Sequence, residues 1–353
     1  MFPSIFLALP TPMTPANPIS LNFLRALPKA ELHLHIEGTL EPEMLFDLAH
    51  KHAITLPYPD IASLRSAYQF GNLQAFLDVY YQGVQVLRDA DDFFQLTQAY
   101  LTHARADGVV HVELFFDPQS HLERGITLVA VFDGLTRALD EAQRESGLSY
   151  RLIPCFLRHL SADAAMQTLE ALLPFRDRFV AVGLDSSENG HPPSKFTAVF
   201  ERARAEGLLT VAHAGEEGPA SYIWEALDLL HVARIDHGVN CESDTALCQR
   251  LAESRIPLTV CPLSNVKLGI FPNMAAHNLK RLLNKGLNIT LNADDPAYFG
   301  GYLLDNYAAA QRELNLSRNE MIQLARNSIE ASFLSDADKQ PWLRKFDLEG
   351  FPG

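Results

Sequence analysis

Basic charge, cysteine and long apolar runs are all scarce in this sequence of 353 residues. Lysine and arginine number 29 against 43 aspartates and glutamates, a formal net charge of -14, so we expect no nucleic-acid-binding face. The four cysteines are scattered without a CxxC pair, which argues against a disulfide framework or a zinc finger and favours the reducing cytoplasm. Because no apolar run approaches the roughly 20 residues needed to cross a bilayer, we expect no membrane partner. These absences favour an enzyme with a small, uncharged substrate.

Residues 1–20 are apolar, but they carry no basic segment and prolines interrupt them early, so we predict an extension rather than a signal peptide. Residues 21–353 show no internal repeat, low-complexity tract or linker, which predicts one domain. A homo-oligomer is compatible with this sequence, which does not fix the oligomeric state.

Eight short apolar runs alternate with helical patterns, as expected for successive βα units and a parallel sheet. The runs are 30–35, 109–116, 150–157, 179–184, 209–213, 234–237, 257–260 and 288–291. Polar clusters follow runs one, five, six and eight, and a closed (β/α)8 TIM barrel gathers such strand ends more readily than an open doubly wound sheet. We therefore predict an α/β barrel, with the open sheet as the alternative.

Two segments exceed a minimal barrel. Residues 41–107 carry several helical patterns and would form a lid or substrate wall over the mouth, whereas residues 303–333 and the tail look helical. Within the insertion, Leu73, Phe76, Leu77 and Tyr80 recur at helical spacing, a pattern that fits either gating or simple packing against the barrel.

The most informative residues are His33 and His35, because alternate residues of a strand point to the same face and two imidazoles there can grip one metal. Together with His213 and Asp294, they supply the ligands that a catalytic zinc needs while leaving a position for water. A lone histidine at a strand end is more often a core residue. The neighbouring Gly215 and Glu216 favour the metal site instead.

Glu216 lies three residues after His213 and resembles a proton donor. The alternative is an acid that stabilises the first turn of the following helix, and Glu217 fits that role better. His237 follows one βα unit later and would orient a metal-bound hydroxide, with a structural histidine as the alternative. Adjacent acids repel, so we expect Asp294 on the metal and Asp295 on the substrate.

Five segments resemble, in order and spacing, the adenosine/adenine deaminase family of the amidohydrolase superfamily: 33–38 (HLHIEG), 213–216 (HAGE), 234–238 (RIDHG), 261–265 (CPLSN) and 292–296 (NADDP). The resemblance covers roughly residues 23–335. It implies a barrel with one zinc held by His33, His35, His213 and Asp294. It also implies Glu216 as proton donor to the purine ring nitrogen, His237 as the hydroxide-orienting group, Asp295 as partner of water and purine, and residues 73–81 as a hydrophobic gate helix that includes Leu73 and Phe76.

Zinc lowers the pKa of bound water from 15.7 to about 7, which supplies a hydroxide near neutrality. Attack on the amino-bearing carbon builds charge on the adjacent ring nitrogen, so Glu216 must be protonated and we expect burial to raise its pKa. Two-metal members of the superfamily bridge their ions with a carboxylated lysine on the fourth strand. Residues 183–188 contain no lysine, which favours one metal.

The substrate prediction rests on departures from the adenosine-specific pattern. Glu188 stands where those enzymes have a glycine, Glu37 replaces a ribose-binding aspartate, and residues 186–196 resemble the adenine deaminase branch. We therefore predict conversion of adenine to hypoxanthine and ammonia in purine salvage, with Glu188 accepting the ring N–H that adenosine lacks. An adenosine deaminase producing inosine, or a deaminase of another 6-aminopurine, is the alternative.

Three other classes of function are disfavoured. A silent purine-binding barrel would have lost a ligand or the acid, and a binuclear hydrolase would hold two metals. A nucleic-acid deaminase would need a basic surface and usually cysteine ligands.

Overall fold

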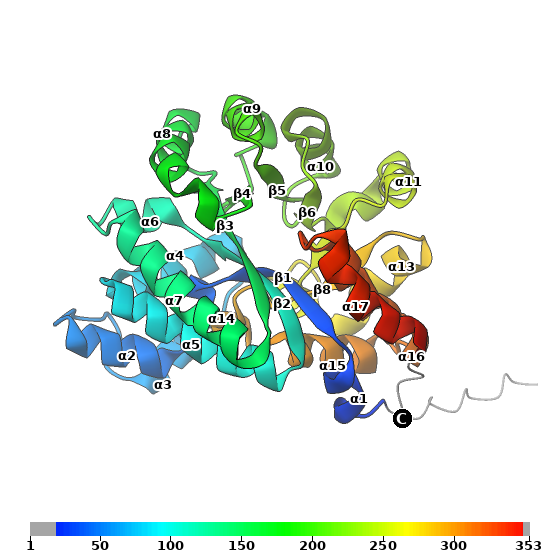
Figure 1. Cartoon of the computed structure of the whole chain (residues 1–353), viewed down its shortest axis with the longest axis horizontal. Helices are drawn as coiled ribbons and strands as arrows, with labels where there is room; N and C mark the ends of the chain where they lie inside the picture. The colour runs from blue at the N-terminus through cyan, green and yellow to red at the C-terminus, as the bar shows by residue number, and fades with distance from the viewer. Residues whose placement is uncertain (1–18, 349–353) are drawn as a thin grey trace, which may run out of the picture.

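Eight parallel strands follow one another around a ring in the order of the chain, and helices surround them (Figure 1). The computed structural model describes residues 19–348. The strands are β1 Lys29–His35, β2 Val109–Phe116, β3 Ser149–Leu157, β4 Ala181–Asp185, β5 Leu209–Ala214, β6 Arg234–His237, β7 Leu258–Val260 and β8 Ile289–Leu291. The predicted (β/α)8 barrel is confirmed, and each predicted strand end differs from the observed end by at most two residues.

The ring closes between β8 and β1 at the carboxyl ends of these strands. The His35 N–H donates to the Asp294 carbonyl at 3.0 Å, and the Asp294 N–H donates to the His33 carbonyl at 3.1 Å. Because the three residues are all predicted metal ligands, the seam of the barrel fixes the backbone of the site.

The sequence of β1 shows why polar residues survive in a fully buried strand. Side chains alternate between the two faces, so Ala30 and Leu32 pack outward against Ile329 of helix α16 (Arg318–Ala331). The intervening Glu31 and His33 face the barrel interior, where both are buried. The inward positions of this strand are therefore free to carry chemistry.

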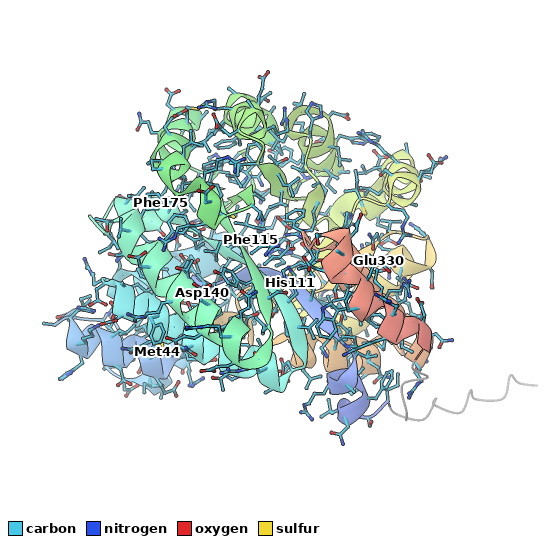
Figure 2. The ribbon with its side chains drawn as sticks, in the orientation of Figure 1. Met44, His111, Phe115, Asp140, Phe175 and Glu330 are labelled. Carbon is cyan, nitrogen blue, oxygen red and sulfur yellow. The ribbon has the colours of Figure 1, made fainter. Side chains whose placement is uncertain are left out.

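A small apolar cluster fills the barrel interior below the histidines. Phe115 of β2 packs with Ile153, Cys155, Ala181 and Val211 in a cluster separate from the main core. Phe115, labelled with His111 of the same strand in Figure 2, touches the rings of three predicted site histidines edge-on or tilted. These apolar side chains line the bottom of the site.

The helices form the outer layer and the insertions. Their bounds are α1 Leu21–Ala26, α2 Pro42–Lys51, α3 Ile61–Ala67, α4 Leu73–Gly83, α5 Ala90–Ala106, α6 Pro118–Leu122, α7 Leu128–Ser146, α8 Ala162–Leu172, α9 Thr197–Ala205, α10 Ala220–Glu225, α11 Thr245–Ser254, α12 Pro262–Lys267, α13 Leu279–Asn284, α14 Pro296–Phe299, α15 Leu303–Glu313, α16 and α17 Asp336–Leu348. The shorter turns are η1 Glu37–Thr39, η2 Val84–Val86, η3 Leu173–Arg178, η4 Pro193–Phe196, η6 Val239–Ser243 and η7 Met274–Ala276, and the segment Ala226–Leu230 is π-helical.

The long insertion between β1 and β2 carries α2 to α5, as the helical patterns predict. Helix α4 begins after Asn72, whose side chain accepts from the Ala75 N–H at 2.9 Å and caps the helix. After β8, α16 packs on β1 and β8, with the Asn327 amide donating to the Ile289 carbonyl at 2.8 Å. The predicted extension over residues 1–20 lies almost wholly outside the described residues. No helix within residues 19–348 is long and apolar enough to cross a membrane.

Candidate metal centre and purine pocket

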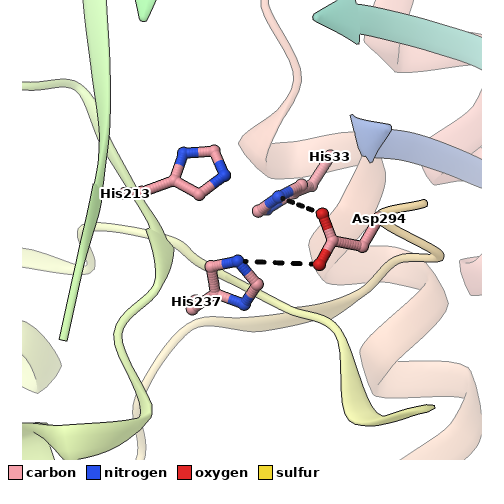
Figure 3. Close-up of side chains that lie close together, drawn as sticks. All are labelled: His33, His213, His237 and Asp294. Atoms are coloured by element: carbon pink, nitrogen blue, oxygen red, sulfur yellow. Dashed lines mark ion pairs between the residues drawn. The ribbon is translucent and has the colours of Figure 1, made fainter. Parts of the chain in front are cut away.

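Four side chains, from β1, β5 and the segment directly after β8, converge at the carboxyl end of the barrel. His33 Nε2 lies 3.1 Å from Asp294 Oδ1, and His35 Nε2 lies 3.5 Å from the same oxygen. From β5, His213 places its Nε2 3.2 Å from His35 Nε2. Figure 3 shows His33, His213 and Asp294 turned toward one another with His237 alongside. The predicted ligand set therefore meets at one point.

The protonation chemistry of this cluster suits a metal ion. Burial lowers the pKa of His35 to about 3 and holds the pKa of His213 well below its usual range, so both imidazoles are neutral. Two neutral imidazole nitrogens facing each other at 3.2 Å repel unless one donates or a cation lies between them. Among the described residues, His33 Nε2 makes no hydrogen bond and faces the Asp294 carboxylate at 3.1 Å. The donors present fit a bound metal.

Outer partners hold the histidines with their Nε2 atoms turned inward. His33 Nδ1 lies 3.0 Å from Thr259 Oγ1, and His213 Nδ1 lies 3.6 Å from Asp236 Oδ2. Asp185 Oδ2 lies 3.6 Å from His35 Nδ1. The Thr259 hydroxyl donates to Asp236, so it accepts from His33 Nδ1 and fixes the tautomer of His33. The two 3.6 Å contacts place a carboxylate beside each of the other imidazoles without a hydrogen bond.

Three residues at strand ends have left-handed backbones. Ser186, His237 and Asp294 have φ values of 71°, 62° and 67°, a region that side chains other than glycine seldom adopt. At His237 this breaks the strand alternation, because Asp236 and His237 then both turn into the barrel mouth. In an extended strand Asp236 and His237 would lie on opposite faces, and the turned backbone at His237 is the reason they do not.

Glu216 lies on the loop after β5, with its Oε1 3.5 Å from His237 Nε2. Burial raises its pKa well above the usual range, and the negative charges of Asp294 and Glu188 raise it further. Oε1 accepts no hydrogen bond from residues 19–348. A buried, neutral carboxylic acid beside the metal cluster is what proton donation to a bound ring requires.

Glu188 does not lie among the residues that line the pocket. Its carboxylate instead accepts four backbone N–H groups, from Gly215 at 2.6 Å, Glu216 at 3.0 Å, Glu217 at 2.9 Å and Gly218 at 2.7 Å. Both oxygens are therefore occupied, which leaves no support for the predicted contact with the purine. The carboxylate organises the loop that carries Glu216.

A directional chain of hydrogen bonds sets the tautomer of His237. The Leu279 N–H donates to His277 Nδ1, so the proton of neutral His277 sits on Nε2 and faces Asn265 Oδ1 at 3.2 Å. The Asn265 amide nitrogen then faces His237 Nδ1 at 3.3 Å and donates to it. Because Nδ1 accepts, His237 carries its proton on Nε2, which lies 3.5 Å from Glu216 Oε1. The same nitrogen lies 3.8 Å from Asp294 Oδ2 (Figure 3).

Asp295 lines the pocket beside Asp294. Burial, together with the charge of Asp294, raises its pKa well above the usual range. Gly38 packs against it so closely that a Cβ there would lie 2.7 Å from the Asp295 Cα. Only glycine at residue 38 leaves room for Asp295 in its observed place.

The pocket has an apolar wall facing the polar cluster. Leu73 and Phe76 of α4, the two predicted substrate contacts, both line it, and Leu268 and Phe299 extend the wall. The Leu73 N–H donates to Glu217 Oε1 at 2.9 Å, which ties the start of this helix to the loop after β5. A flat aromatic substrate would lie between the wall and the cluster.

A family model for adenosine deaminase matches residues 28–347. The chain belongs to the adenosine deaminase family. Two curated relatives, each named adenine deaminase, come from Hahella chejuensis and Acinetobacter baylyi. They are 57% and 56% identical to this chain, and each alignment covers 92% of this chain and 98% of the relative.

Solved structures of other members of this fold resemble the chain closely. The crystal structure of adenine deaminase from Arthrobacter aurescens has a TM-score of 0.89 at 50% identity, covering 91% of this chain and 98% of that one. An amidohydrolase from Burkholderia ambifaria, with bound Zn, has a TM-score of 0.85 at 29% identity, covering 93% of each chain. The barrel and its deaminase relationship agree with the sequence prediction.

Several contributors to the site were missed in the sequence. Asp236, Asn265 and His277 act on other side chains rather than on a ligand. The segment 261–265 signalled Asn265 without indicating its role, whereas His277 lies in a turn with no recognisable pattern. Asp117 and Asp185 also line the pocket. Their positions directly after β2 and at the end of β4 are the signal that was available.

Proposed function

We propose that this protein hydrolyses adenine to hypoxanthine and ammonia with one zinc ion. The observation that carries this conclusion is the buried, neutral Glu216 beside a convergent cluster of three histidines and Asp294. The relatives at 56% and 57% identity, which are named adenine deaminase, support adenine as the substrate.

His33, His35, His213 and Asp294 would hold the zinc, because nitrogen and carboxylate donors in this number suit that ion. The structure with bound Zn supports this choice of metal. When bound, zinc lowers the pKa of a coordinated water and so provides a nucleophile at neutral pH. The end of β4 contains no lysine to bridge a second ion, so we propose one metal per chain.

Glu216 donates a proton to N1 of the purine, the ring nitrogen beside the carbon that is attacked. The protonated acid neutralises charge as it develops on the ring, which lowers the barrier in a site shielded from water. His237 presents its Nε2 proton to the attacking oxygen and orients it. Asp295 contacts the water and the purine.

The atoms of the reaction balance without a further reactant. Water supplies the oxygen that replaces the amine at C6. Of its two hydrogens, one ends on N1 through Glu216 and the other leaves with the amine as ammonia.

The apolar wall of Leu73, Phe76, Leu268 and Phe299 would cover one face of the base and exclude bulk water. Leu73 and Phe76 thus serve as substrate contacts. We place the reaction in purine salvage, and the cysteines, all of which are buried and free, are compatible with the cytoplasm.

The first experiment is ammonia release from adenine and from adenosine, side by side, with metal content measured on the same sample. We expect turnover of adenine, little turnover of adenosine and about one zinc per chain. Turnover of adenosine alone would keep the family and overturn the substrate, and two metals per chain would overturn the single-ion site.

A further inference from the structure

Free adenine differs from adenosine in one recognisable group. Its five-membered ring carries an N–H, on N9 or N7, whereas the sugar of adenosine occupies N9 and removes this donor. A site that selects the free base needs an acceptor in the pocket for the N–H. Glu188 does not fill this role, because its oxygens are taken by four backbone amides.

Asp117 is a buried carboxyl group with acceptor capacity to spare. It follows β2 directly, lines the pocket and is 2% exposed. Its Oδ1 has no hydrogen-bond partner in the part of the chain that the structure describes. The other oxygen, Oδ2, receives only a long contact of 3.4 Å from the Tyr80 hydroxyl.

A buried carboxylate holds the backbone N–H of Asp117. Its N–H donates to Glu37 Oε1 at 3.1 Å, and the same oxygen lies 2.7 Å from His121 Nε2. Glu37, which the sequence had linked to the loss of sugar space, is fully buried and does not line the pocket. Glu37 thus supports Asp117 rather than contacting the ligand.

Most other acceptors in the pocket have partners or assigned roles. Asp185 Oδ2 lies 3.6 Å from the Nδ1 of His35, a proposed metal ligand, although neither Asp185 oxygen makes a hydrogen bond within residues 19–348. Ser186 Oγ accepts from the Tyr81 hydroxyl at 2.9 Å and lies 2.8 Å from His159 Nδ1. Glu216 and Asp295 act on the six-membered ring and the water. Asp185 is within ion-pair distance of a proposed metal ligand, whereas Asp117 makes no ion pair in the part of the chain that the structure describes, so Asp117 is the carboxyl group left for the substrate.

We propose that Asp117 accepts the hydrogen bond from the imidazole N–H of the free purine base and so selects adenine against purines substituted on N9. This inference rests on the proposed function and assigns its specificity to one side chain. A carboxyl group accepts such a bond through its carbonyl oxygen in either protonation state. With an N9-substituted purine, the buried Oδ1 would face carbon instead of a donor, and a site built around a polar contact discriminates by about 10⁴ to 10⁵.

The test compares adenine with 9-methyladenine, which keeps the reacting amidine and lacks the N–H. For the wild type, we expect kcat/KM to favour adenine by about 10⁴. In Asp117→Ala, we expect kcat/KM for adenine to fall by about 10² to 10³ while the value for 9-methyladenine stays within about threefold or rises. Asp78→Ala, which removes an exposed carboxylate of α4, is the matched control and should change neither value.

An equal fall for both substrates in Asp117→Ala would mean a structural role and overturn the proposal. His35, Asp117 and Asp185 lie close enough together to bind a metal ion. If the wild type holds two metal ions per chain and Asp117→Ala loses one of them, Asp117 is a metal ligand and the proposal is overturned. If Asp117→Ala does not fold, Asp117→Leu nearly keeps the size, removes the acceptor and should reduce the adenine preference at least tenfold; an unchanged preference would refute the assignment.

Binding of the products separates this inference from the proposed function. Hypoxanthine carries the same N–H and 9-methylhypoxanthine does not, so calorimetric Kd values report on Asp117 without turnover. We expect the wild type to favour hypoxanthine and Asp117→Ala to lose that preference. If adenine yields no ammonia, the proposed function fails, while the ratio of the two Kd values still decides the role of Asp117.

Discussion

The two ends of the barrel bury similar charged residues in opposite ways. At the amino end, Arg234 Nη1 donates to Glu113 Oε2 at 2.6 Å and Nη2 donates to the Leu32 carbonyl at 3.0 Å. Burial opposes ionisation of Glu113, yet Arg234 and His111 lower its pKa to about 2. At the carboxyl end, burial raises the pKa of Glu216 instead, because acidic neighbours add to it.

This difference separates stability from chemistry. The charges of Arg234 and Glu113 at the amino end are paired with each other, although Arg234 Nε makes no hydrogen bond within the described residues. Within residues 19–348, several polar atoms at the carboxyl end make no hydrogen bond, including Asp117 Oδ1, Asp185 Oδ1 and Asp295 Oδ1. Unsatisfied buried groups are rare in folded proteins and cost stability, so their concentration at one end marks where ligands bind.

The largest expected effect is on the chemistry of the carboxyl end. Glu216→Gln removes the acidic proton while keeping the size of the side chain, and we expect kcat/KM for adenine to fall by about 10² to 10⁴ or more. Zinc content and melting temperature should stay near wild type. Near-normal ammonia release would remove Glu216 from the mechanism.

Arg234→Met tests the amino end. It leaves Glu113 buried without its cation, and we expect the free energy of unfolding to fall by about 3–5 kcal/mol, measured in urea. Activity per folded molecule should change little. The double variant Arg234→Met/Glu113→Leu is the control and should recover much of the loss; no recovery would contradict the view that this pair is a matched ionic unit.

Glu188→Gln should lower both the stability and the activity. One acceptor oxygen remains for four amides, so we expect about 2–3 kcal/mol lower stability. Because Glu188 organises a loop, kcat/KM should fall by a similar factor for adenine and 9-methyladenine. Gly218→Ala, whose Cβ would lie 2.6 Å from Glu188 Cδ, should act in the same direction. Loss of substrate preference in Glu188→Gln alone would restore the original substrate-contact hypothesis.

Asn265→Leu removes the donor that fixes the tautomer of His237. We expect kcat to fall by about 10- to 100-fold with KM nearly unchanged, because the proton on His237 Nε2 is no longer enforced. Gln98→Leu, which removes a surface amide bonded to Glu141, is the matched control. A rise in KM without a change in kcat would assign Asn265 to substrate binding instead.

The smallest effect is a pH dependence. The raised pKa of Glu216 means that the acid is still protonated as pH rises past its ordinary range, and activity is lost only as pH passes the raised value. We expect log kcat/KM for adenine to decline by about one per pH unit on that alkaline limb. In Glu216→Gln the decline should be absent, and its persistence would assign the limb to another group.

The sequence predicted the strands and the convergence of the metal cluster for a physical reason. Buried parallel strands read as short apolar runs, and strand ends in a barrel meet at one mouth, so His33, His213 and Asp294 had to approach one another. The backbone hydrogen bonds between His33, His35 and Asp294 fix the positions of these ligands, and no sequence pattern indicates those bonds.

The roles of Glu188 and Asp236 could not be predicted in the same way. Backbone amides have no residue identity, so four of them gathered on Glu188 leave no trace in the sequence. Asp236 shares the barrel mouth with His237 only because His237 is left-handed, and side-chain alternation assumes an extended backbone.

The bond between the Leu73 N–H and Glu217 Oε1 joins the apolar wall of the pocket to the loop after β5. Leu73 and Phe76 line the pocket from α4, and Glu217 is the chain neighbour of Glu216. A displacement of α4 that opened this wall would break the bond one residue away from the acid. Opening of the wall and loosening of the acid would then be a single event.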